Sequence, residues 1–436
     1  MSDKGRLLSG FQDFLPSAML TRNRVIETVK SVYSRFGFLP QETPTLEYAS
    51  LLLGKYGDNQ KLVYEFKDRG GRELAMRYDL TVPLGRIIEM YGNSLIFPYR
   101  RFQIGMVWRA DKPGKGRYRE FMQMDADIVG DDSLLSDLEI LQMNLEIMNA
   151  LKVRATIRIN SRNILEALLE AGKLEKSDGL KMLRVIDKFD KIGSSGVYSE
   201  LSDLGFSEDV LALVQSYLSI EGDNTKVLNS LKELLGGSPS FNAGYLRLSS
   251  IVDTLSGLAD ADPNRIKVDP SIARGLDYYT GLVFETVFLD DPAFGSICSG
   301  GRYDQMAKRS NGEALPTIGM SIGLDRLFAA MSVAGLVSPV ETTTKVFIVN
   351  FSDQYLLRYI SLAKTLRDAG VSVEISSKAT KIGKQLGLAN SKGIPFVVLL
   401  GENEIDSGKV IIRDMKTGLQ NEISAEGLIP FLKAKD

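Results

Sequence analysis

The stretch VWRADKPGKGRYREFMQMDADIVG, residues 107–130, joins a cationic loop to a strand that carries carboxylates. Its first half gathers arginines and lysines around glycines and a proline, which predicts a turn between two strands. Its second half alternates apolar and polar residues, which predicts a strand with Gln123, Asp125 and Asp127 on it. Such a loop can place guanidinium groups on a phosphate. A solvated hairpin tip is an equally good interpretation of the loop taken alone.

The patterns on either side of this stretch predict a sheet covered by helices. Helical spacing spans 19–36, strand-like alternation recurs at 73–83, 101–109 and 121–129, and helical spacing returns after Asp131. One helix, several strands and then a long helix do not make regular βαβ repeats. The expected sheet is therefore antiparallel or mixed.

Patterning also divides the chain into a large domain, a linker and a small domain. The large domain is expected at 1–336 and contains a mostly helical insertion at about 160–250. The linker at 337–344 includes SPVETTT, and residues 345–436 alternate between strand and helix patterns. The fold class expected from these patterns is α/β (α+β).

Composition excludes several classes of chemistry. The 436 residues include no histidine, and Cys298 is the single cysteine. Triads with an imidazole base, HExxH metal sites and structural zinc sites are therefore not expected. The net charge of −2 means that a polyanion must be held by local basic patches. A charged N-terminus, and the lack of an apolar run of about 18 residues, predict a cytoplasmic protein without a membrane partner.

The sequence has none of the common nucleotide-binding loops, because GxxxxGK[ST] and a GxGxxG between strand and helix are both absent. The loop at 109–119 is the best alternative, and Phe121 at its exit could stack on a base. Three further segments place glycines beside charged or tyrosine residues: ARGLDYYTG (273–281), GGRYD (300–304) and GMSIGLDRL (319–327).

Together with MRYDLTVP (76–83), these segments resemble the histidyl-tRNA synthetases, a class II aminoacyl-tRNA synthetase family, in order and spacing. The resemblance covers nearly the whole chain, and ARGLDYYTG is its most specific motif. The segment with Pro44 resembles class II motif 1, 107–130 resembles motif 2 and 319–327 resembles motif 3. The resemblance implies an antiparallel-sheet catalytic domain and, at 345–436, an anticodon-binding domain.

The implied activity is that of a histidine–tRNA ligase. The enzyme would activate L-histidine with ATP to histidyl-adenylate and transfer the histidine to the 3′ end of its tRNA. Its partners would be histidine tRNA, L-histidine and ATP, with Mg²⁺ as a cofactor, and motif 1 would form a homodimer interface.

Two rival functions are considered. A synthetase for another amino acid of the same subclass is opposed by ARGLDYYTG. A non-catalytic paralogue could instead act as a regulatory subunit of histidine biosynthesis. Such paralogues usually lose the motif arginines and the C-terminal domain, whereas this chain keeps Arg109, Arg274, Arg326 and residues 345–436.

The resemblance assigns roles to individual residues. The catalytic residues would be Arg274, between the substrate carboxylate and the α-phosphate, and Arg109 on the α-phosphate. The ATP-binding set would comprise Arg109, Asp111, Arg119, Phe121 as the stacking partner of adenine, and Arg326 on the γ-phosphate. The histidine-binding set would comprise Asp79, Leu80, Thr81, Arg109, Gln123, Asp127, Arg274, Tyr278, Tyr279 and Tyr303.

Within the histidine-binding set, Asp79, Thr81 and Gln123 would bind the α-amino group. Asp127 and Tyr279 would read the two imidazole nitrogens. No metal would be held by a dedicated protein site. The tRNA would contact a lysine cluster in 376–392, although a solvated basic surface is the alternative; the cluster comprises Lys378, Lys381, Lys384 and Lys392.

The absence of histidine is compatible with this reaction. An ionised carboxylate attacks the α-phosphorus, so the first step needs positioning and cationic stabilisation rather than a general base. No enzyme-borne titration is expected near neutral pH, apart from the N-terminal amine or a strongly shifted carboxylate. The sequence leaves two explanations of this absence open. The protein could be made even when histidine is scarce, or its histidines could have been removed by design.

Overall fold

The computed structural model describes residues 5–54, 57–114, 116–257, 265–275, 278–338 and 340–435. The chain divides into two units, one of Met1–Gln12 with Val25–Val337 and the other of Asp13–Arg24 with Ser338–Asp436. No helix within the described ranges is long and apolar enough to cross a membrane.

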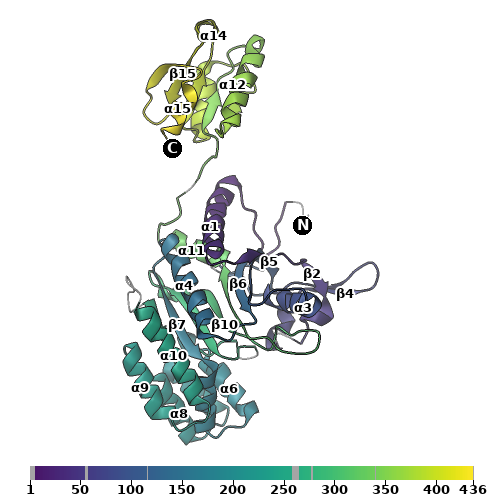
Figure 1. The fold of residues 1–436 in the computed structure, drawn as a ribbon, viewed down its shortest axis with the longest axis vertical. Coiled ribbons are helices and arrows are strands. Elements are labelled where there is room, and N and C mark those ends of the chain that lie inside the picture. The colour runs from purple at the N-terminus through teal and green to yellow at the C-terminus, as the bar shows by residue number, and fades with distance from the viewer. Residues whose placement is uncertain are drawn as a thin grey trace. The chain divides into compact units, whose positions relative to one another are not determined.

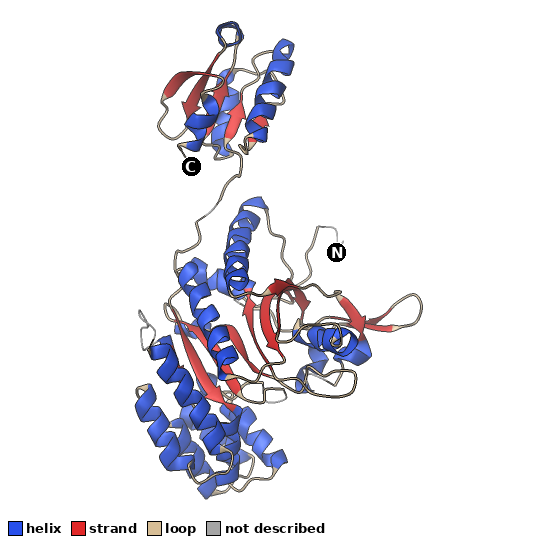
Figure 2. Cartoon of the chain, in the orientation of Figure 1, coloured by secondary structure: helices blue, strands red, loops and turns tan. Residues whose placement is uncertain are grey.

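The larger unit is built on a sheet that its described residues form from eight strands (Figures 1 and 2). In spatial order these are β1 (Leu39–Pro40), β5 (Tyr99–Trp108), β6 (Glu120–Val129), β11 (Thr317–Gly323), β10 (Ser296–Arg302), β9 (Leu282–Phe288), β7 (Ala155–Ser161) and β8 (Ile266–Val268). Neighbours are antiparallel except the two edge pairs, β1–β5 and β7–β8. The prediction of an antiparallel or mixed sheet is confirmed.

The hairpin of β5 and β6 contains the stretch 107–130. Its register runs from Tyr99 opposite Val129 to Trp108 opposite Glu120. The loop between the strands closes on itself, because Gly114 and Arg117 exchange two backbone hydrogen bonds of 3.0 Å. Along β6, the fully buried Met124, Ala126 and Ile128 point into the hydrophobic core, so the residues between them point to the opposite face of the sheet.

Helices cover the core face of this sheet. The long helices are α1 (Pro16–Arg35), α4 (Leu134–Ala150) and α10 (Phe241–Ser256), and α11 (Leu324–Val333) follows β11 directly. Apolar residues of all four helices belong to the same core cluster as those of β6. Tyr33 on α1 also donates a hydrogen bond of 2.9 Å to the Met124 carbonyl, which fixes the helix on the hairpin.

A small sheet, two helices and a 3-10 turn lie outside the main sheet. They comprise β2 (Leu46–Tyr48), α2 (Ala49–Leu52), a 3-10 turn (Gly57–Leu62), β3 (Glu65–Lys67), β4 (Glu73–Met76) and α3 (Thr81–Tyr91). The strand predicted at 73–83 is wrong beyond Met76, because helix α3 begins at Thr81. Asp79 Oδ1 accepts the N–H groups of Thr81 and Val82, at 3.1 and 3.0 Å, and so caps the helix. Pro83 fits in the first turn, where no N–H is needed.

The stretch between β7 and β8 is helical in its described part, where the sequence predicts an insertion. Its helices are α5 (Arg162–Ala171), α6 (Lys176–Ile186), α7 (Phe189–Asp203), α8 (Glu208–Leu218), α9 (Asn224–Leu235) and α10. Their buried leucines, isoleucines and valines continue the core of the main sheet.

The smaller unit has a five-stranded sheet among its described residues, in the order β13 (Val373–Ile375), β12 (Val346–Ile348), β14 (Phe396–Leu399), β15 (Lys409–Asp414) and β16 (Gln420–Ser424). Its helices are α12 (Leu356–Asp368), α13 (Ile382–Ser391), α14 (Glu402–Ser407) and α15 (Leu428–Lys433), with a 3-10 turn at Asp353–Tyr355. Val346 and Ile348 pack into one core while Phe347 packs into another, so β12 is covered on both faces.

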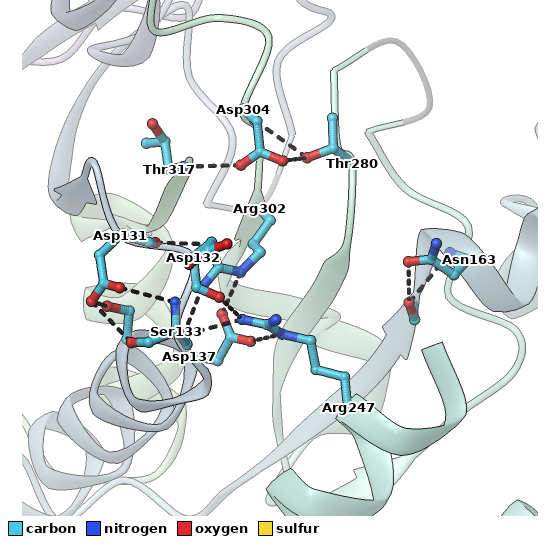
Figure 3. Close-up of polar contacts among 12 residues, drawn as sticks. Asp131, Asp132, Ser133, Asp137, Asn163, Arg247, Thr280, Arg302, Asp304 and Thr317 are labelled. Carbon is cyan, nitrogen blue, oxygen red and sulfur yellow. Dashed lines mark hydrogen bonds and ion pairs between the residues drawn. The ribbon is translucent and has the colours of Figure 1, made fainter. Parts of the chain in front are cut away.

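A buried carboxylate ties three elements of the larger unit together (Figure 3). Asp137 on α4 is fully buried, and its Oδ1 lies 2.8 Å from Nε of Arg302 at the end of β10. Its Oδ2 is paired with Arg247 on α10. Two residues after Arg302, Asp304 accepts hydrogen bonds from Thr280 Oγ1 (2.6 Å) and from the N–H of Thr317 (2.9 Å). These bonds fix the loop that carries Tyr303.

We expect Asp137→Ala to lower the free energy of unfolding of the larger unit by about 3–5 kcal/mol, because it leaves two guanidinium groups without their buried counter-charge. Chemical denaturation followed by circular dichroism measures the loss. Asp178→Ala is the matched control, since the Asp178–Lys181 pair lies at the surface and should contribute little. Equal stability of the two variants would contradict the anchoring role of Asp137.

Candidate active site

Two adjoining cavities lie on the face of the sheet that the polar residues of β6 point to. The inner cavity has a volume of about 170 Å³ and is lined by Asp79, Thr81, Arg109, Gln123, Asp125, Asp127, Tyr278, Tyr279, Ser299, Gly300, Tyr303, Met306, Gly319, Met320 and Ser321. The outer cavity has about 180 Å³ and is lined by Arg109, Asp111, Gly116, Arg117, Tyr118, Phe121, Gln123, Ser296, Ile297, Cys298, Ser299, Ser321, Gly323, Asp325 and Arg326. Four residues belong to both: Arg109, Gln123, Ser299 and Ser321.

The floor of the inner cavity holds a buried ion pair. Arg101 on β5 is fully buried, and its Nη2 lies 2.7 Å from Asp127 Oδ2 and 3.1 Å from the Leu80 carbonyl oxygen. The Tyr303 hydroxyl donates a hydrogen bond to Asp127 Oδ1. Burial, and then the charge of Asp127, hold the pKa of Tyr303 well above its usual range, so this hydroxyl stays a donor.

Asp125 is the second buried carboxylate of the inner cavity. Burial, and then the nearby charge of Asp127, raise its pKa to about 7. Asp125 is therefore the strongly shifted carboxylate that the sequence-based expectation allowed as an exception. The chain therefore has a carboxyl group whose pKa is raised toward neutral pH, although it has no histidine.

Two neighbouring tyrosines form a wall of the inner cavity. The rings of Tyr278 and Tyr279 have centroids 4.3 Å apart at 47°. Gly275 has φ +63° and lies so close that a Cβ would stand 2.0 Å from Tyr279 Cδ2. Only glycine fits there, which explains the first glycine of ARGLDYYTG. Two residues of that motif, 276 and 277, lie outside the described residues.

The outer cavity presents guanidinium groups. Arg109 donates from Nε to the Tyr78 carbonyl at 3.0 Å, and its guanidinium carbon lies 4.2 Å from the Tyr78 ring centroid and 5.2 Å from that of Phe121. Two aromatic rings therefore hold Arg109 where the cavities meet. Arg326 donates from Nη2 to the Phe294 carbonyl at 2.6 Å. Burial lowers the pKa of Arg326 from its ordinary value.

Three residues of the predicted sets do not line either cavity. Leu80 is buried and offers its carbonyl oxygen to Arg101. Arg119 donates to the carbonyls of Asp111 and Ser9, at 3.0 and 3.2 Å, and so shapes the loop. Arg274 is about half exposed, and its Nε lies 2.6 Å from Oε1 of the buried Glu285.

The predicted lysine cluster surrounds helix α13. Lys378, Lys381 and Lys384 are exposed at the start of the helix. Lys392 follows the last turn and is paired with Glu374. The first three lysines therefore form one patch, while Lys392 lies at the other end of a ten-residue helix, roughly 15 Å away.

Several lining residues were absent from the predicted sets. Asp125 could have been found from the two-residue alternation on β6, because Gln123 and Asp127 were already included. Ser299 and Ser321 carry no such signal, since they reach the cavities only through the pairing of β10 with β11.

Comparisons with known proteins agree along the whole chain. The family model described as histidyl-tRNA synthetase matches residues 10–327, and the model described as anticodon binding domain matches 345–435. The chain is 40% identical to the histidine–tRNA ligase of Rhodopirellula baltica, over 98% of each chain. It is 38% identical to that of Clostridium tetani, over 99% of this chain and 98% of the relative.

Solved structures give the same result. The histidyl-tRNA synthetase of Nostoc sp. PCC 7120 superimposes with a TM-score of 0.88 at 32% identity, covering 99% of this chain and 100% of that one. A Bacillus halodurans protein described as an ATP phosphoribosyltransferase regulatory subunit/histidyl-tRNA synthetase superimposes with a TM-score of 0.75 at 19% identity, covering 89% and 97%. The second likeness shows the fold alone.

We expect Gly319→Ala to weaken binding of L-histidine, the ligand that the resemblance implies, about tenfold to a hundredfold. A Cβ at Gly319 would stand 1.9 Å from Asp127 Oδ1, so the carboxylate would have to move. Gly323→Ala on the same strand is the control, because its nearest contact would be an ordinary 3.8 Å. Isothermal titration with both variants decides the point, and equal affinities would show that Asp127 does not need its present position.

Proposed function

The chain belongs to the histidyl-tRNA synthetase family, and on that basis we propose which of its residues carry out each part of the reaction. The enzyme activates L-histidine with ATP to histidyl-adenylate and transfers the histidine to the 3′ end of its tRNA. ATP, L-histidine and the tRNA are its substrates.

The observation that supports the assignment of residues is the meeting of two unlike cavities at Arg109. The inner cavity carries three carboxylates, from Asp79, Asp125 and Asp127, and suits the amino acid. The outer cavity carries Arg109 and Arg326 and suits the phosphates. Their shared wall is where the histidine carboxylate would meet the α-phosphorus of ATP.

Activation would proceed by attack of that carboxylate oxygen on the α-phosphorus, with pyrophosphate leaving. Arg109, held between two aromatic rings, would stabilise charge on the α-phosphate without having to reorganise. Phe121 lines the outer cavity and offers a face to adenine. Arg326 would hold the γ-phosphate. Arg274, which would act between substrate carboxylate and α-phosphate, must exchange its contact with Glu285 for substrate.

Selection of histidine would rest on the floor of the inner cavity. Asp127 can accept an imidazole N–H, and Tyr279 in the same cavity can pair with the other ring nitrogen. An analogue without ring nitrogens would leave these buried groups unpaired, which is heavily penalised.

We propose that Mg²⁺ arrives as a complex with ATP. Within the described residues, no group of three or more cysteine, aspartate or glutamate side chains is arranged to hold a metal ion. The residues do not fit a dedicated cage, and no step is assigned to the metal. Phosphate oxygens are the usual ligands of Mg²⁺ in such sites.

We also propose a homodimer that forms through the region around motif 1. Apolar side chains are exposed there on β1 and the small sheet, including Leu39, Leu46, Tyr48 and Phe66, and exposed apolar patches mark interaction sites. Sedimentation of the full chain tests this interface. The cytoplasmic location remains a prediction from the sequence.

The regulatory paralogue is the weaker alternative. The motif arginines are present, and both cavities are formed in one chain. The smaller unit, which we propose as the anticodon-binding domain, is present as well.

We expect Arg274→Ala to reduce histidine-dependent ATP–pyrophosphate exchange by about 10²- to 10³-fold, because it removes one preorganised cation from the developing charge. Arg154→Ala is the matched control, since Arg154 pairs with Asp290 at the surface. Unchanged melting temperatures would show that both variants fold. Near-normal exchange in Arg274→Ala would remove Arg274 from the catalytic set.

We expect replacement of the four lysines around α13 by alanine to weaken tRNA binding and to flatten its dependence on salt, because fewer counterions would be released. Lys392 should contribute least, since it is already paired with Glu374. A control variant replaces lysines elsewhere on the same unit, at Lys364, Lys409, Lys416 and Lys433. Filter binding at several salt concentrations compares them, and equal slopes would place the tRNA contact elsewhere.

A further inference from the structure

Asp125 has no role of its own in the assignment above, although it lines the inner cavity. It stands on β6 opposite Gln103 of β5 and Ser321 of β11, and it is 2% exposed. Residues two apart on a strand lie roughly 7 Å apart. Asp125 is therefore flanked on the same face by Gln123, proposed for the α-amino group, and by Asp127, proposed for the imidazole ring.

The carboxylates of Asp125 and Asp127 differ in what they already bind. Asp127 is paired with Arg101 through one oxygen and accepts the Tyr303 hydroxyl through the other. Asp125 is hydrogen-bonded to Ser321, but its Oδ1 is buried and has no partner among the described residues. Gln123 uses its amide nitrogen on Ser321, and its Oε1 likewise has no partner in that part of the chain. Two residues that line the cavity thus carry buried acceptors that lack a donor within the described residues.

The charges around Asp125 come from every neighbouring element. Asp127 on β6 and Asp79 before α3 are negative, and Arg101 on β5 is positive but paired with Asp127. Arg77, directly after β4, also lies within electrostatic range. Three neutral groups complete the surroundings: Tyr33 on α1, Tyr303 after β10 and Cys298 on β10. No ion pair is formed by Asp125 within the described ranges.

We propose that Asp125, whose side chain lines the inner cavity, binds the α-ammonium group of histidine through its carboxylate, as a specificity-determining residue. This inference rests on the proposed function. The Asp127–Arg101 pair is neutral overall, and it matches an imidazole ring that is mostly neutral at pH 7. The carboxylate of Asp125 has no such counter-charge, so a ligand group with a full positive charge compensates it best. The ammonium has three N–H donors, enough for Asp125, Gln123 and Asp79 together.

The proposal has a pH signature. An ammonium ion binds the ionised carboxylate and opposes its protonation. Since burial and the charge of Asp127 raise the pKa of Asp125 to about 7, the dissociation constant for histidine should rise as the pH falls through that value. Protonation of the substrate ring also changes the dissociation constant at lower pH. The contribution of Asp125 is therefore the difference in pH dependence between wild type and an Asp125→Asn variant.

The test is a chemical double-mutant cycle by isothermal titration with the full-length enzyme. The ligands are L-histidine, L-histidinol, which keeps the ammonium, and imidazolepropionate, which lacks it. Asp125→Asn keeps the shape of the side chain. It should weaken L-histidine and L-histidinol about tenfold to a hundredfold and leave imidazolepropionate within about twofold. Asp127→Asn is the comparison, and it should weaken all three because it acts on the ring.

The outcomes separate the possible roles. If Asp125→Asn weakens all three ligands equally, Asp125 shapes the cavity or faces the ring, and the proposal is overturned. Unchanged affinities, or the same pH dependence of histidine binding in Asp125→Asn and wild type, would also overturn it. Histidine-dependent pyrophosphate exchange by the wild type is measured alongside. If the wild type shows no such exchange, the proposed function is contradicted. If it shows exchange but Asp125→Asn loses affinity equally for all three ligands, only the role of Asp125 is contradicted.

Discussion

The ion pair between Arg101 and Asp127 is the interaction on which the site depends. Arg101 has no exposed surface, and burying an unpaired guanidinium or carboxylate would cost several kcal/mol. Pairing the two allows strand β6 to carry a row of largely buried polar residues on the face that lines the inner cavity. The Tyr303 hydroxyl and the Leu80 carbonyl complete the pair. GGRYD and MRYDLTVP therefore meet at one buried charge, although they lie far apart in the sequence.

In the proposed assignment of residues, the two cavities divide the chemistry. The inner cavity is rich in acceptors, which suits the ammonium and ring N–H groups of an amino acid. The outer cavity is rich in guanidinium groups, which suits phosphates. Arg109 stands between them and is held by Tyr78 and Phe121, so the cation lies in place before either ligand binds. A reaction that only joins a carboxylate to a phosphorus needs this arrangement and no imidazole.

The sequence predicts most of the fold but less of the site. The β5–β6 hairpin follows from alternation around a Gly-rich loop, because that signal is local. The helix that begins at Thr81 could not be predicted in this way, because the sequence there alternates like a strand while Asp79 caps a helix. Asp125 was within reach of the same alternation that placed Gln123 and Asp127. Its raised pKa could not be predicted from the sequence, since it depends mainly on burial by the rest of the fold.

Arg274 shows how the helical insertion and the site are linked. Its Nε lies 2.6 Å from Glu285 on β9 and 3.7 Å from Asp187, which follows α6. Arg158 makes a similar link from β7, the neighbour of β9 in the sheet. It pairs with Asp269 at 2.6 Å and with Asp190 of α7 at 2.9 Å. Both arginines thus join a strand of the main sheet to the junction of α6 and α7. The contact with Asp187 is long and half exposed, so it is weak and easily exchanged, whereas the buried Glu285 holds the arginine beside the site. Glu285 therefore sets the position from which the Arg274 guanidinium would have to move in the proposed reaction.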